Sequence, residues 1–198
     1  MRPAVTLIDG PGSEPLTLVE IKAHLRVTHA DEDTLIAAYL RGARRAIETR
    51  TGMTLLQQTW EAAWPCFPGV SADNPRGGFV MPRPPLLSVT SVKYIDSGGT
   101  ETTLAASEYT VDARAFPGEV VLAFDKSWPV TRDVPNAVVI RFVAGFGTEG
   151  GAVPESIRDA VRLETGDRYR LREDADTEGL VSRGAVRSLL ANEQPYVV

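Results

Sequence analysis

The chain has 198 residues, enough for one large domain or two small ones, and it carries a net charge of −5 with a sequence pI near 5.1. Generic affinity for nucleic acid needs a basic surface, so this charge argues against a DNA-binding module, although it leaves room for a local basic face. The single cysteine, Cys66, excludes an intrachain disulfide and a cysteine-based zinc site. No apolar run approaches the about 20 residues of a membrane helix, so we expect a soluble, unexported protein with no membrane partner.

Two helices are predicted near the N-terminus, after an extended arm over residues 1–16. Residues 17–20, Thr-Leu-Val-Glu, form a capping box, in which the threonine caps the helix start and the glutamate reaches back. A short helix is therefore predicted over about 18–27. Apolar residues then repeat at helical spacing over 35–47 and Gly52 supplies a stop, which predicts a second helix over about 32–50.

The central part of the chain has the pattern of β-strands. Strand-forming residues alternate over 86–95 and recur over 109–111, 120–124 and 137–143, with turn residues between them. Three tryptophans lie in or beside this region, and core packing or a protein contact explains them better than nucleotide stacking does: Trp60, Trp64 and Trp128. We expect a β-rich unit with short strands at hairpin spacing.

A helical pattern returns at Pro154 and continues to about 171, and a brief last helix is predicted over 185–191. This order predicts an α+β protein: a small helical bundle, made of two N-terminal helices plus a C-terminal helix, with an inserted antiparallel β unit. We expect residues 1–53 and 154–198 to form the bundle with its N-terminal arm and C-terminal tail. Residues 54–153 form the inserted unit.

The loop Gly145–Gly150 matches the G-x-G-x-x-G pattern, follows a strong strand and precedes a helix. A nucleotide-binding enzyme using this loop is therefore one alternative. The predicted helix starts several residues after the third glycine, however, and no second parallel strand follows to carry a ribose-binding acid. A flexible glycine hinge between the β unit and the helix explains the loop better, and we expect no cofactor.

No sequence pattern assigns catalytic or metal-ligating residues. The only two histidines, His24 and His29, lie near the N-terminus without the ligand spacing of a metal site. There is no G-x-S-x-G nucleophile elbow, and no pair of acids is singled out for sugar chemistry. We therefore predict no catalytic, cofactor-binding or metal residue and expect that the protein is not an enzyme.

Four arginines give the second predicted helix a locally basic face: Arg41, Arg44, Arg45 and Arg50. A solvated, salt-bridged helix face is one interpretation. The sharper one is a subunit interface or a surface near DNA. A cytoplasmic DNA-binding regulator that uses this helix is a further alternative, which the acidic balance of the chain disfavours.

An ordered series of short motifs resembles the head–tail connector, or adaptor, proteins of long-tailed phages and of gene transfer agents. No single piece is specific, but their order over residues 18–173 is. The series comprises residues 18–27, 47–52, 58–60, 82–89, 92–96, 128–129, 144–147 and 153–158. One stretch departs from the family, because the last long helix reads Arg-Leu-Glu-Thr-Gly-Asp at 162–167, where an apolar run is usual.

The resemblance implies a structural adaptor without catalytic residues. It implies a ring, usually of twelve subunits, that lies between the portal protein and the next tail component, a stopper or a tail terminator. Such a ring extends the DNA channel, and genomic DNA passes through its lumen without sequence-specific binding. The resemblance further implies synthesis in a bacterial cytoplasm and assembly at the head–tail junction of a phage-like particle.

The C-terminal segment, about 173–198, is predicted to be mobile alone and to order on the portal. An acidic run over 173–179 cannot bury enough apolar surface to offset its ordering entropy. The apolar residues beyond it fit one helix face or end the chain, and they are candidates for portal docking: Val186, Leu189, Leu190, Tyr196, Val197 and Val198. Packing of this tail on the protein's own helices is the alternative.

Overall fold

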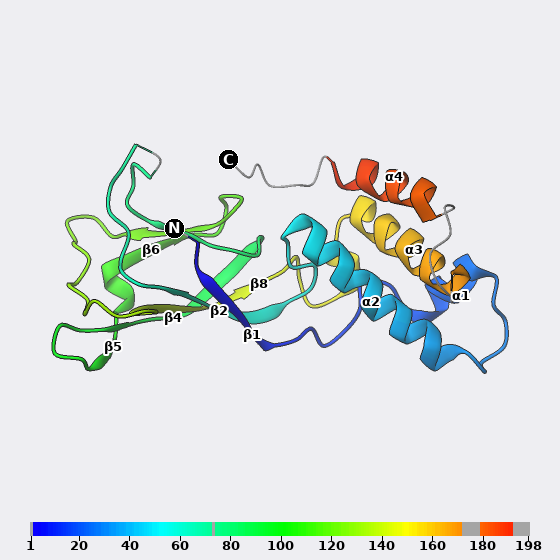
Figure 1. Ribbon diagram of the computed structural model, residues 1–198, viewed down its shortest axis with the longest axis horizontal. Coiled ribbons are helices and arrows are strands. Elements are labelled where there is room, and N and C mark those ends of the chain that lie inside the picture. The colour runs from blue at the N-terminus through cyan, green and yellow to red at the C-terminus, as the bar shows by residue number, and fades with distance from the viewer. Residues whose placement is uncertain (1, 73, 172–178, 192–198) are drawn as a thin grey trace. The chain divides into compact units, whose positions relative to one another are not determined.

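The computed structural model describes residues 2–72, 74–171 and 179–191, and the described chain divides into two units (Figure 1). The helical unit comprises Pro11–Leu56 and the chain from Phe146 onward, whereas the β unit comprises the chain up to Gly10 and Gln57–Gly145. Each unit has its own hydrophobic core. The predicted α+β class, with an antiparallel β unit inserted between helices, is confirmed.

The first two helices begin and end where their local signals predict. Helix α1 (Leu18–Leu25) is closed by the Thr17 capping box: the Glu20 amide donates to the Thr17 hydroxyl at 3.2 Å, and the Thr17 amide donates to the Glu20 carboxylate at 2.7 Å. Helix α2 (Asp33–Thr51) ends at Gly52, whose φ of 71° favours glycine. The apolar stripe of α2 lies in the core of the unit through Ile36, Leu40, Ala43 and Ile47.

Two later helices complete the helical unit. Helix α3 (Glu155–Arg170) packs against α2, and α4 (Gly179–Leu190) packs against α3, so that the three lie side by side in Figure 1. The buried side chains of α3 recur at helical spacing, at Ile157, Ala160 and Val161. Helix α4 begins earlier than the predicted residue 185.

Strand β8 (Val138–Ala144) is the central strand of a five-stranded antiparallel sheet in the order β1-β2-β8-β4-β5. Its neighbours are β2 (Gln58–Trp64) and β4 (Leu86–Ile95), and the edge strands are β1 (Ala4–Asp9) and β5 (Glu101–Thr103). The residues of β8 alternate between buried and more exposed, with Phe142 and Ile140 fully buried. One face of the sheet therefore packs in the core of the β unit.

A second sheet of three strands packs in the same core. It consists of β3 (Phe79–Val80), β7 (Glu119–Leu122) and β6 (Tyr109–Asp112), in that order. Phe79 and Val120 contribute buried side chains to the core. Trp64 is buried there beside Phe79, and Trp128 stacks on Phe67 with ring centroids 4.8 Å apart, which agrees with a packing role for the tryptophans.

The main difference from the sequence interpretation concerns residues 1–16. Ala4–Asp9 pairs with β2 as an edge strand and so lies in the β unit, whereas an extended arm attached to the bundle was predicted. The strand depends on its pairing with β2, because its own side chains are mostly exposed and only Val5 packs on the core. A pattern of burial in the sequence therefore does not reveal it. The inserted unit also ends at Gly145, earlier than the predicted residue 153.

No helix of the described chain combines the length and the apolar character needed to cross a membrane.

The α1 capping box predicts a specific pH dependence. Hydrogen bonds from the Thr17 amide and hydroxyl, and then the Arg158 guanidinium, lower the pKa of the Glu20 carboxyl below its ordinary 4.5. Because the folded pKa is depressed, its stabilisation is complete above the unfolded value and is lost as pH falls through the folded pKa. Glu20→Gln should therefore destabilise the helical unit near neutral pH, and the difference from wild type should vanish in acid. Urea unfolding followed by circular dichroism measures it, with the exposed Glu149→Gln as the control for loss of one charge.

Candidate interaction surfaces

The four arginines of the predicted basic face lie in different environments. Arg41 and Arg45 are exposed on α2, four residues apart. Arg44 is only 5% exposed, and Arg50 is exposed but forms an ion pair across to α3. The structure therefore divides the basic face, and only Arg41 and Arg45 retain guanidinium groups that no described carboxylate pairs with.

Arg44 belongs to a buried network that holds three segments of the helical unit together. Its Nε donates to Glu14 and its Nη1 donates to Glu48, each at 2.8 Å. Glu48 in turn accepts a hydrogen bond from the Leu55 amide at 3.1 Å. The prediction that Arg44 is available to a partner is corrected here. Glu14 lies thirty residues earlier in the chain, so helical spacing alone does not reveal that it covers this side of α2.

Arg50 shares a carboxylate with a residue of α3. Glu164, 8% exposed, accepts from Arg50 Nη1 at 2.8 Å and from Arg168 Nε at 3.2 Å. The buried Thr165 donates its hydroxyl to the Val161 carbonyl at 2.7 Å. These contacts account for the packing of the polar stretch 162–167, where the resemblance implied an apolar run. The helix is kept in the bundle by a satisfied ion pair and a satisfied hydroxyl instead of by apolar area alone.

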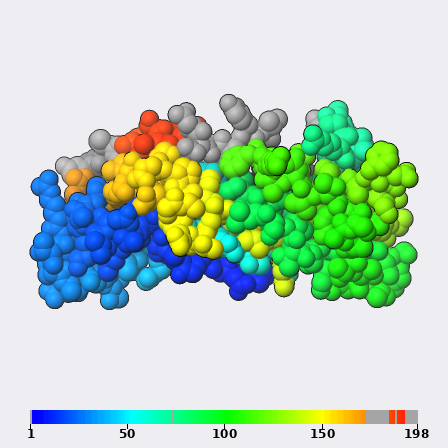
Figure 2. Space-filling model, turned by 180° about the vertical axis from the view of Figure 1, so that it is seen from behind, coloured from blue at the N-terminus to red at the C-terminus, as the bar shows by residue number. Residues whose placement is uncertain are grey.

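Ion pairs also join α1 to the start of α3. The Arg158 guanidinium contacts Glu20 at 2.7 Å and donates to the Pro15 carbonyl at 3.2 Å. Figure 2 shows the N-terminal part of the helical unit in blue beside the first turns of α3 in yellow on this face. The acids at this junction are thus already neutralised within the chain.

The residues of the predicted docking tail also differ in their environments. Val186 and Leu190 are 1% and 2% exposed in the core of the helical unit, and the partly buried Leu189 packs against the same core. This arrangement corresponds to the alternative in which the tail packs on its own helices, at least as far as residue 191. The remaining candidates, Tyr196, Val197 and Val198, lie outside the described residues.

The glycine loop is explained by close packing. A Cβ at Gly150 would lie 2.4 Å from the Pro15 carbonyl oxygen, and Gly145 has a φ of 129° where β8 ends. The Ser13 hydroxyl donates to the Thr148 carbonyl at 2.8 Å, which ties the loop to the segment before α1. The preceding strand β8 lies between two antiparallel neighbours, and α3 begins at Glu155. This is not the strand–loop–helix setting of a dinucleotide site.

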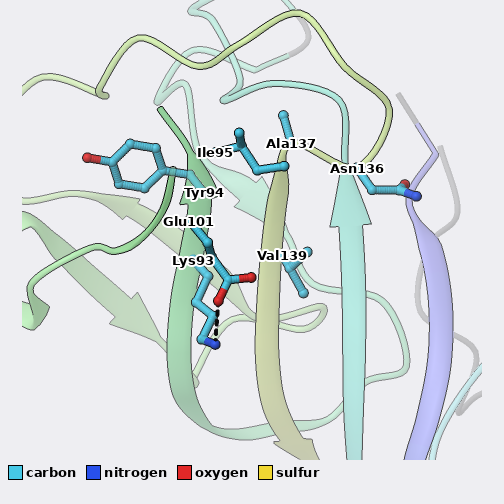
Figure 3. A pocket seen from close by; sticks show the side chains of 7 residues that line it. All are labelled: Lys93, Tyr94, Ile95, Glu101, Asn136, Ala137 and Val139. Carbon is cyan, nitrogen blue, oxygen red and sulfur yellow. Dashed lines mark hydrogen bonds and ion pairs between the residues drawn. The ribbon is translucent and has the colours of Figure 1, made fainter. Parts of the chain in front are cut away.

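A pocket at one end of the larger sheet is far too small for a nucleotide (Figure 3). Its volume is about 40 Å³, room for a few water molecules. It is lined by Lys93, Tyr94, Ile95, Glu101, Asn136, Ala137 and Val139, and Lys93 and Glu101 form an ion pair at 2.8 Å. Among the described residues no group of three His, Cys, Asp or Glu side chains could hold a metal ion, and Cys66 is exposed.

One exposed apolar feature escaped the sequence interpretation. Phe124 is 99% exposed in a tight turn that the Lys126 amide closes by donating to the Ala123 carbonyl at 3.2 Å. Val130, 78% exposed, lies in the same loop. The sequence placed Phe124 at the end of a strand predicted over 120–124. Strand β7 ends two residues earlier, so the side chain projects from the turn instead.

Comparison with known proteins finds a family similar to the first half of the chain. Residues 15–84 match the family model of the phage gp6-like head–tail connector proteins. The resemblance to the head–tail connector proteins is confirmed. The matched residues include α1 and α2, with Arg44 and Glu48, and the strands β2 and β3 of the β unit. No curated protein has a significantly similar sequence.

Solved structures show the same fold over nearly the whole chain. A protein from the neck of an empty gene transfer agent particle, computed with C6 symmetry, has a TM-score of 0.78 at 24% identity, with 98% of this chain and 97% of that chain covered. A protein of a native gene transfer agent virion has a TM-score of 0.77 at 25% identity, with 98% and 96% covered. A protein from the neck of the native particle, computed with C12 symmetry, has a TM-score of 0.74 at 24% identity, with 98% and 97% covered.

Adjacent glycines in the loop test its packing role. Gly150→Ala should destabilise the helical unit by about 1–3 kcal/mol, because the new methyl group would overlap the Pro15 carbonyl. Gly151→Ala is the matched control, since nothing lies within 4 Å of its Cβ position. Urea unfolding of both variants measures the difference. Equal stability of the two would contradict the packing account.

The arginines of α2 should separate in the same assay. Arg44→Ala leaves the Glu14 and Glu48 carboxylates buried without their cation and should cost about 3–5 kcal/mol. Arg41→Ala, on the exposed side of the same helix, should change the free energy of unfolding by no more than about 0.5 kcal/mol. A variant at Arg44 as stable as the one at Arg41 would show that the network contributes little.

Proposed function

We propose that this chain is the subunit of a head–tail connector ring that joins the portal of a phage-like particle to its tail and extends the DNA channel. The observation that carries the proposal is the fold match over 98% of the chain to proteins of gene transfer agent necks, together with the connector family match. The neck structures have C6 and C12 symmetry, and both are compatible with a ring of twelve copies.

The two-unit architecture suits a ring subunit. A cyclic ring needs two different surfaces on each copy, because its interfaces are heterologous and close by rotation. The β unit offers two exposed features of this kind, the Phe124 loop and the open edge of β1. Further surfaces remain for the portal on one side and for a stopper or tail terminator on the other. Synthesis in a bacterial cytoplasm, before assembly at the head–tail junction, belongs to the same proposal.

Portal docking, in this proposal, belongs to the end of the chain beyond α4. Val186 and Leu190 are committed to the core of the helical unit, so they cannot also fill a groove on a partner without leaving it. Tyr196, Val197 and Val198 are the apolar candidates that remain. A short apolar segment that reaches into a groove of another protein is a common mode of recognition.

Two truncations test this assignment. A chain ending after Ala191 keeps α4, so it should unfold at the wild-type temperature, but it should no longer join portal-bearing heads. A chain ending after Arg172 also loses Val186 and Leu190 from the core and should melt several degrees lower, because burial of each side chain stabilises by about 1.5–3 kcal/mol. Calorimetry and electron microscopy of head attachment are the measurements. Normal attachment of the chain ending after Ala191 would exclude the terminal residues from docking.

A further inference from the structure

The exposed side of α2 carries two arginines on an otherwise small and uncharged surface. Arg41 and Arg45 lie four residues apart, about 6 Å along the helix axis, and both are exposed. The other exposed positions of this helix face are Thr34, Ala38 and Thr49. No bulky side chain separates the two guanidinium groups from an approaching partner.

The surroundings of this pair add positive charge. The Arg168 guanidinium lies beside Gly42, where a Cβ would be only 3.3 Å from its Nη1, so it flanks the pair on the side of α3. Arg168 and Arg50 share the single carboxylate of Glu164. The two exposed arginines of α2 therefore lie beside a third guanidinium, that of Arg168, whose one carboxylate partner, Glu164, is shared with Arg50. Like charges at i and i+4 repel, and an anionic partner would remove that cost.

The acids of the helical unit are poorly placed to be that partner in a neighbouring copy. Glu14 and Glu48 are taken by Arg44, Glu20 by Arg158, and Asp33 by Lys22. Glu155 and Asp159 contact Arg158 or Arg162 as well. Of the described carboxylates in this unit, those of Glu149 and Asp167 have neither a cation nor a hydroxyl beside them, and Asp31 has only His29, which is charged only when protonated.

We propose that the Arg41–Arg45 face binds the phosphate backbone of double-stranded DNA. Guanidinium groups pair with phosphate oxygens through two parallel hydrogen bonds, and their attraction is independent of base sequence. Contacts to phosphate oxygens carry no base-sequence information, so the proposed binding is non-specific. This inference rests on the proposed function, in which DNA passes through the ring, and it assigns to α2 the contact with that DNA.

The test is the salt dependence of DNA binding by the full chain. A labelled random-sequence duplex is titrated by fluorescence anisotropy from low to physiological salt. Replacing Arg41 and Arg45 together by alanine should lower the slope of log affinity against log salt by about two, and the low-salt affinity by about tenfold or more. Replacing both by lysine should keep most of the slope, since charge and not geometry dominates.

The matched control removes two exposed arginines from the β unit, Arg76 and Arg114, with the same change in net charge. Its slope should equal that of the wild type. Equal slopes for the two alanine variants, or a wild-type chain that does not bind duplex DNA even at low salt, would overturn the inference. So would a variant at Arg41 and Arg45 that loses self-association while its DNA slope is unchanged, because the partner would then be an acidic surface of a second copy.

Failure of this inference is distinguishable from failure of the proposed function. Attachment to portal-bearing heads is measured without reference to Arg41 and Arg45. One outcome is that the chain joins heads but the salt slope of its DNA binding is unchanged when the two arginines are replaced. That outcome supports the ring assignment and contradicts the DNA contact. The opposite outcome is that the salt slope falls as expected but the chain does not join heads. That outcome supports the DNA contact and contradicts the ring assignment.

Discussion

The buried pairing of Arg44 with Glu14 and Glu48 is the constraint on which the helical unit depends. A guanidinium that is 5% exposed is tolerable only when its charge is balanced and its donors are used. Here the balance comes from a carboxylate one helical turn away and from another in the segment before α1. Because Glu48 also accepts from the Leu55 amide, the network ties the start and the end of the first half of the unit to the middle of α2.

The chain that returns from the β unit contacts the segments near Leu55 and Pro15. The Phe146 amide donates to the Leu55 carbonyl at 3.3 Å, and Gly150 lies against the Pro15 carbonyl. The chain leaves the helical unit near Leu56 and comes back near Phe146, so both ends of the insertion are anchored on segments that the Arg44 network positions. An inserted unit with its own core can be carried in this way without disturbing the packing of α2 against α3.

The polar α3 shows how the bundle closes without a continuous apolar face. Glu164 is neutralised by arginines from two helices, and Thr165 turns its hydroxyl back onto its own helix. Gly166 and Gly42 let side chains of neighbouring helices approach closely, His24 in one case and Arg168 in the other. Arg41 and Arg45 take part in none of these ion pairs, and they lie one helical turn apart on the same exposed face of α2.

Local signals in the sequence determined the elements of this protein and the order in which they occur. The capping box at Thr17, the stop at Gly52 and the strand-forming residues over 86–95 are local signals, and the structure has the predicted helix start, helix end and strand, although two irregularities interrupt the alternation of the strand. The ordered motifs also sufficed to indicate the connector family.

Tertiary structure alone decided which residues are available to partners. Arg44 and Arg41 are three residues apart on one helix, yet Glu14 covers the first and leaves the second exposed. The N-terminal residues became an edge strand because β2 offered an unpaired edge, and Val186 and Leu190 became core because they share a cluster with the few apolar side chains that α3 buries. Contacts between residues far apart in sequence leave no periodic trace in either segment, so no reading of one segment could have revealed them.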